Sequence, residues 1–79
     1  MSGLIVEIIP DSEQGGFTAR VPDIPAYGEG DTEEPALADL REALAAHVEA
    51  FGIDDAMARV NSPSSLRHLD VDLADLARA

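Results

Sequence analysis

The sequence has no cysteine and no lysine, and its aromatic side chains are one tyrosine and two phenylalanines. Without cysteine the chain can form no disulfide, no thiolate-ligated zinc site and no thiolate nucleophile. No apolar run approaches the roughly 20 residues that a membrane-spanning helix requires. The N-terminal residues show no basic region followed by an apolar stretch, so we expect no signal peptide and a cytoplasmic protein.

Positive charge is scarce as well. Five arginines stand against 16 acidic residues, which gives a formal net charge of −11. Proteins that bind nucleic acids neutralise phosphates with lysine and arginine, and anionic lipids attract basic segments, so we expect neither interaction. A chain of 79 residues that is 46% apolar is instead typical of one small folded domain.

The first third of the sequence predicts a β-hairpin. Residues 4–9 are rich in β-branched side chains, residues 17–21 alternate between apolar and polar, and the glycines at 15 and 16 suit the turn. One register places Glu7 opposite Arg20 and makes one face of the hairpin continuously apolar. That face carries Leu4, Val6, Ile8, Phe17, Ala19 and Val21, and the other carries Ile5, Glu7, Ile9, Thr18 and Arg20. The isoleucines of the second face predict that something partly covers it.

The middle of the chain predicts a short third strand around residues 26–29 and a helix over residues 32–51. The helix follows from an apolar stripe at helical spacing: Leu37, Leu40, Leu44, Val48 and Phe51. Either Asp31 or Thr32 can serve as the N-cap, Asp31 and Glu34 fit a capping box, and Gly52 is a natural stop.

The C-terminal part predicts a short second helix over residues 54–60, with Ile53, Met57 and Val60 as its apolar contacts. Residues 69–73 alternate strictly and predict a strand, although Leu69, Leu73 and Leu76 also fit a helical spacing. The expected order is therefore β-β-β-α-(α)-β, a two-layer α+β sandwich with an antiparallel sheet. Residues 1–52 form its core in this interpretation, and residues 53–79 complete the same domain.

Few residues suggest chemistry. Asp70 and Asp72 share one side of the expected strand, a spacing that can hold a cation, but surface charges that protect a strand edge explain them better. His47 and His68 are expected to be exposed or half-buried structural residues. We therefore predict no catalytic residue, no metal site and no cofactor. Tyr27 lies in a loop rich in proline and glycine, where it either anchors a partner or packs on its own helix.

Several segments together resemble the HicB-like antitoxin domain. They are Leu4–Ile9, the Gly-Gly-Phe-Thr-Ala run at 15–19, Val-Pro-Asp-Ile-Pro at 21–25, Gly-Asp-Thr at 30–32 and Glu-Ala-Leu at 42–44. The resemblance covers residues 4 to about 52. It implies a partial RNase H-like fold without catalytic activity, and a short, stand-alone member, because residues 52–79 contain no DNA-binding motif.

The resemblance also implies partners: a small basic ribonuclease toxin of the HicA type, occluded by direct binding, and a homodimer or higher oligomer. The net charge of the chain suits such a toxin, because complementary charge accelerates and selects association. The residues expected to contact a partner are Ile5, Ile9, Tyr27, Glu29 and Asp31. One alternative is a structural or regulatory homo-oligomer of the same fold that has no toxin. Another is a metal-dependent hydrolase using Asp70, Asp72 and Asp75.

Overall fold

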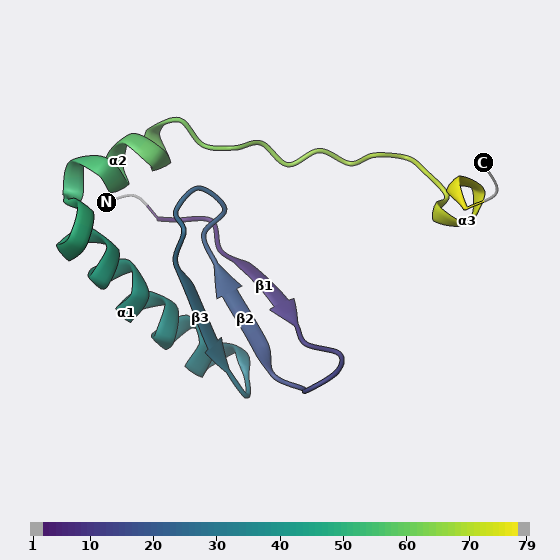
Figure 1. Cartoon of the computed structure of the whole chain (residues 1–79), viewed down its shortest axis with the longest axis horizontal. Coiled ribbons are helices and arrows are strands. Elements are labelled where there is room, and N and C mark those ends of the chain that lie inside the picture. Colours follow the sequence, from purple (N-terminus) through teal and green to yellow (C-terminus); the bar gives the residue numbers. More distant parts are fainter. Residues whose placement is uncertain (1–2, 78–79) are drawn as a thin grey trace.

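The structure, a computed structural model, describes residues 3–77. Its elements are β1 (Glu7–Pro10), β2 (Phe17–Arg20), β3 (Tyr27–Gly30), α1 (Glu33–Phe51), α2 (Ile53–Asn61) and α3 (Leu73–Leu76). The strands form an antiparallel sheet in the order β1-β2-β3, and α1 packs against β3 and β2 on one face (Figure 1). The architecture is α+β, as the sequence predicts.

The hairpin has the predicted register. Glu7 pairs with Arg20 and Ile8 with Ala19, so Ile8 and Ala19 lie on the inner face, toward α1. The turn between β1 and β2 is held by Asp11, whose carboxylate accepts the backbone N–H groups of residues 13 and 14 at 2.9 and 3.1 Å. Gly15 and Gly16 adopt positive φ angles of 78° and 85°, which cost glycine little. β1 begins at Glu7, so residues 4–6 lie outside the regular strand that the sequence predicts.

Two glycines of β3 determine where α1 lies. A Cβ on Gly28 would lie 2.1 Å from the Leu40 nitrogen, and a Cβ on Gly30 would lie 2.5 Å from the Ala36 nitrogen. The helix therefore packs backbone to backbone on β3. Because α1 lies over β3 and β2, it covers the inner side of β1 less than that of β3.

The core is small and built largely of alanine. Its buried apolar residues are Ala19, Val21, Ile24, Ala26, Ala36, Leu40 and Ala56. Most of the predicted stripe of α1 packs here: Leu40 is buried, and Leu37, Leu44 and Val48 are partly buried against the core. Phe51 is the exception, since 67% of its surface is exposed.

The start of α1 also differs in detail from the prediction. Thr32 occupies the N-cap position with extended backbone angles, but no side chain makes a capping hydrogen bond, so the capping box of Asp31 and Glu34 does not form. At the other end Gly52, with φ of 91°, donates its N–H to the Val48 carbonyl at 2.8 Å and ends the helix as predicted.

Helix α2 packs on α1 through a smaller residue than predicted. Ala56 is its buried residue and Val60 is partly buried, whereas Ile53 and Met57 are 57% and 47% exposed. The helix is amphipathic enough to form, but its larger apolar side chains stay on the rim of the interface.

The predicted strand over residues 69–73 is wrong. Residues 63–72 have no regular structure, and a single helical turn, α3, begins at Leu73. We call residues 3–61, which hold the sheet, α1 and α2, the body. The Ser64 N–H donates a hydrogen bond to the Asp23 carboxylate of the body at 2.6 Å. Beyond it the chain runs away from the sheet (Figure 1). We call residues 62–77 the arm. An alternating sequence forms a strand only beside a partner strand, and none lies next to it among residues 3–77.

Candidate functional site

The outer face of the sheet, opposite α1, gathers four of the five residues predicted to contact a partner. The strand register places Glu7, Arg20 and Tyr27 in one row across the sheet, and Ile9, Thr18 and Glu29 in the next. Ile5 precedes β1 with the same parity as Ile9. No helix packs on this face in the described part of the chain, so the predicted cover over the isoleucines is missing.

Apolar side chains on this face are open to solvent. Ile5 is 75% exposed, Tyr27 56% and Ile9 39%. Exposed apolar residues that are scattered singly are ordinary, but here three share one sheet face, with Glu7, Arg20 and Thr18 between them. The sequence therefore predicted which residues share the face. It did not predict that the face is bare.

Arg20 lies at the centre of this face and contacts both an acidic side chain and an aromatic one. Its Nε lies 3.5 Å from the Glu7 carboxylate, and its guanidinium carbon lies 5.8 Å from the centre of the Tyr27 ring. The first distance is an ion pair, too long for a good N–H···O hydrogen bond. The second is a cation–π contact, which holds the tyrosine ring against the sheet. The sequence indicated the Glu7 partner but not the Tyr27 contact.

A hollow of about 340 Å³ at the turn end of the sheet collects carboxylates. Asp11, Glu29 and Asp31 line it together with Thr18 and Gly30. The sequence predicted Glu29 and Asp31 as contact residues but missed Asp11, which the β1–β2 turn brings beside them. Hydrogen bonds from the backbone of residues 14 and 13 hold the pKa of Asp11 below its ordinary value, so this carboxylate is negatively charged at neutral pH. Such a hollow suits lysine or arginine side chains of a partner.

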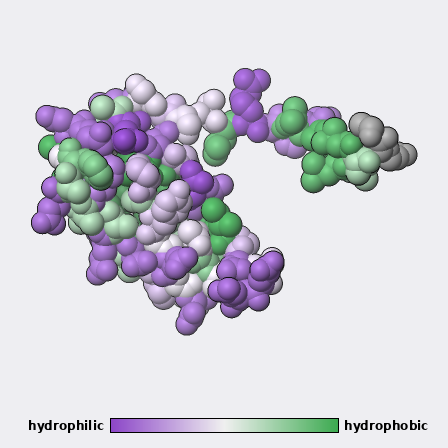
Figure 2. Space-filling model, viewed as in Figure 1, coloured by the Kyte–Doolittle hydropathy of each residue, from purple (hydrophilic) through white to green (hydrophobic). Residues whose placement is uncertain are grey.

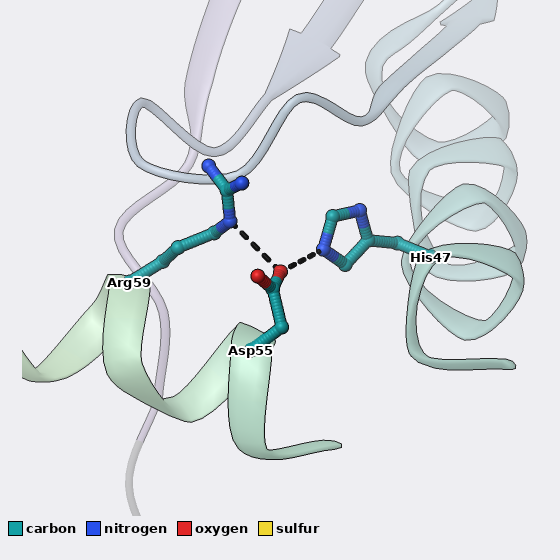
Figure 3. A network of polar contacts seen from close by, with 3 residues as sticks. All are labelled: His47, Asp55 and Arg59. Carbon is teal, nitrogen blue, oxygen red and sulfur yellow. Dashed lines mark hydrogen bonds and ion pairs between the residues drawn. The ribbon is translucent and has the colours of Figure 1, made fainter. Parts of the chain in front are cut away.

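A second polar network joins α1 to α2 (Figure 3). His47 Nε2 lies 2.8 Å from one Asp55 carboxylate oxygen, and Arg59 Nε donates to the same oxygen at 2.9 Å. These contacts, the Arg59 bond first and the His47 bond second, lower the pKa of Asp55. His47 is buried, with its ring 4.8 Å from that of Phe51, and is not the exposed or half-buried residue that the sequence predicted. The network is a clasp between two helices.

The other candidate groups remain apart. Asp70 and Asp72 are exposed on the arm, where Asp72 accepts the Ala74 N–H at 2.9 Å and caps α3. His68 is exposed on the same segment. Among residues 3–77 no group of three His, Cys, Asp or Glu side chains is placed to hold a metal ion.

Comparisons with known protein families, with curated proteins and with solved structures give no match. In the described part of the chain no helix has the length and apolar character to cross a bilayer. The candidate site is an open sheet face that has Arg20 at its centre, exposed apolar residues beside it and carboxylates at one end.

Proposed function

We propose that this chain is a non-catalytic, antitoxin-like protein that binds and occludes a small basic ribonuclease toxin of the HicA type. The observation that carries the proposal is the outer face of the sheet, which holds exposed Ile5, Ile9 and Tyr27 and has the acidic hollow at one end. Apolar anchors surrounded by charge are the usual composition of a binding face. The resemblance of residues 4–52 to the HicB-like domain supports the same assignment.

Charge supports the choice of partner. A ribonuclease needs a basic surface to hold RNA, and a chain with a net charge of −11 is attracted to that surface. The carboxylates of Glu29, Asp31 and Asp11 would meet the toxin's basic side chains, and the exposed apolar side chains would exclude water from the contact. In such a complex the acidic protein takes the place of the RNA.

The proposal is tested first by growth. Where a small basic reading frame adjoins this gene, it is expressed in a test bacterium, alone and with this protein. We expect growth to stop when the reading frame is expressed alone and to recover in the presence of this protein. A neighbour that is harmless alone, or whose toxicity persists in the presence of this protein, refutes the assignment.

Three variants then locate the contact. We expect Tyr27→Ala and Glu29→Lys each to weaken toxin binding at least tenfold, which corresponds to about 1.4 kcal/mol. Glu49→Lys is the matched control, because it makes the same charge change at an exposed position on α1, away from this face. Equal loss with all three variants would mean that net charge, and not the outer face, determines binding.

A second candidate function is a structural or regulatory homo-oligomer of the same fold that has no toxin partner. The exposed arm favours it, because no other part of residues 3–77 covers the arm's large apolar side chains. A gene neighbourhood without a small basic reading frame would favour this function over the first.

A further inference from the structure

The arm carries the most exposed apolar surface of the molecule. Leu66 and Leu69 are each 78% exposed and Leu73 is 75% exposed, and Figure 2 shows apolar side chains gathered along the arm and at its far end. Leu76 and Val71 are 59% and 42% exposed. Leu69, Val71 and Leu73 alternate with two aspartates, so an extended arm presents one apolar side. A segment with this pattern is suited to lie beside a strand and to fill an apolar groove.

The rest of the molecule offers such a groove between the segment that leads into β1 and the two long helices. Two apolar hollows adjoin there, and Leu4 and Leu44 line both of them. One, of about 170 Å³, lies under α2, and the other, of about 370 Å³, lies along α1. Apart from Arg41 and His47, their lining residues are apolar. Leu4 and Val6 line the groove just before β1, which is an edge strand with one side of its backbone unpaired within the sheet.

We propose that the arm of one copy of this chain docks in the groove of a second copy, and that two copies exchange their arms. Leu69, Val71 and Leu73 face the groove, and the arm backbone pairs with the open edge of β1 as a fourth strand. The exchange is symmetric, because each copy gives one arm and receives one. The alternation in residues 69–73 then has the partner strand that a single chain does not provide.

The direction of the arm favours a second copy over the arm's own body. After the contact between Ser64 and Asp23 the chain leaves the body, and its own groove stays open to solvent. The Cα radius of gyration is 15.6 Å, whereas a compact chain of this length has about 12 Å. The arm is therefore presented outward, where another molecule can take it.

Charge permits this pairing of two acidic chains. Residues 1–61 contain thirteen acidic and three basic side chains, whereas residues 62–79 contain three acidic and two basic ones. Residues 62–79 thus carry a net charge of −1, against −10 for residues 1–61, so the arm meets little repulsion. Arg41, which makes no ion pair with any described residue, lines the groove and reduces the negative charge there.

The buried area is sufficient for a stable dimer. Two arms seat six large apolar side chains, and at about 100 Å² each they supply about 600 Å². The grooves that receive them contribute a comparable area. A specific interface needs about 1,200 to 2,000 Å² in total, so the exchange reaches that range.

The test measures mass in solution for the full chain and two variants. Val71→Asp places a charge on the apolar side of the arm, and Leu4→Asp places one in the groove, at a residue that is 44% exposed and outside the buried core. By light scattering after gel filtration we expect the wild type at twice 8.3 kDa and each variant at 8.3 kDa. Asp70→Ser, on the other side of the arm, is the control and stays dimeric. Circular dichroism confirms that each variant is folded.

Complementation separates a second copy from the arm's own chain. The two variants are co-expressed with different tags, because the intact arm of Leu4→Asp can fill the intact groove of Val71→Asp. We expect a heterodimer to be recovered through both tags. A monomeric wild type, or failure of the two variants to associate while each is folded, overturns the proposal and points to fold-back within one chain.

This inference does not depend on a toxin, because it uses the β1 edge and the inner side of the sheet. Variants Tyr27→Ala and Glu29→Lys of the outer face are expected to leave the dimer mass unchanged. If they abolish dimerisation, the outer face and not the arm joins the copies. Failure of the toxin experiment alone leaves the arm exchange intact.

Discussion

Gly28 brings the backbone of α1 into direct contact with β3. A Cβ at this position would lie 2.1 Å from the Leu40 nitrogen and 2.3 Å from the Ala36 carbonyl oxygen. Both atoms are helix backbone and cannot move aside without displacing α1. We therefore expect Gly28→Ala to lower the free energy of unfolding by about 3 kcal/mol or more, or to prevent folding. Urea denaturation followed by circular dichroism measures this.

Gly3 provides the matched control for that substitution. A Cβ there meets no atom within 4 Å, so Gly3→Ala is expected to change the free energy of unfolding by less than about 0.5 kcal/mol. Equal losses of unfolding free energy at the two positions would mean that the close approach of α1 to β3 does not cause the cost of Gly28→Ala.

The Asp55 clasp predicts a specific dependence of stability on pH. The bonds from Arg59 and His47 lower the folded-state pKa of Asp55 below its ordinary 3.8. A lowered folded pKa means that the carboxylate stabilises the fold above about pH 4, and that this contribution is lost as the pH falls through the folded pKa. We expect Asp55→Asn to be less stable than the wild type at pH 6 and the gap to narrow near about pH 2.5. Urea denaturation at both pH values measures the gap, and a gap of the same size at both would contradict the assignment.

At the scale of elements, local patterns were sufficient wherever an element packs on its neighbour in sequence. The hairpin register and the helix stripe follow from alternation and spacing, and both are confirmed by the pairing of Glu7 with Arg20 and the burial of Leu40. The arm was not predictable in this way. Alternation over residues 69–73 tells which side chains share a side, but it does not tell which surface covers them.

The candidate site was predictable to the same extent. Ile5, Ile9, Tyr27 and Glu29 share the outer face because strand parity puts them there. Asp11 joins the acidic hollow only through the geometry of the turn, and His47 is buried only because α2 folds back and presents Asp55. Such contacts depend on the tertiary arrangement, so they cannot be predicted from the spacing of residues in the sequence.

Neighbouring isoleucines in β1 test which face of the sheet is covered. Ile8 is partly buried against the core, whereas Ile9 lies on the open face. Ile8→Thr places a hydroxyl among apolar side chains and is expected to cost about 1 to 3 kcal/mol, whereas Ile9→Thr should cost less than about 1 kcal/mol. Chemical denaturation of the two variants gives the comparison, and the reverse order would require the opposite face to be buried.

At the scale of the whole molecule, the small core explains why a second copy matters. Alanine fills many of its core positions, and a domain of about 79 residues buries too little apolar surface to be strongly stable alone. Many of the large apolar side chains that lie outside the core are on the arm, where they are exposed to water. Seating two arms in two grooves would return that surface to an interior, so folding and association become linked.

Linked folding and association make thermal stability depend on concentration. A dimer that forms only from folded chains is stabilised by mass action, so we expect Tm to rise by several degrees when the protein concentration is raised about 100-fold. The Val71→Asp variant, which is unable to seat its arm, should melt at a lower temperature that does not change with concentration. Calorimetry of both proteins over that range decides the matter. A Tm of the wild type that is independent of concentration would mean that the arm contributes nothing to the stability of the fold.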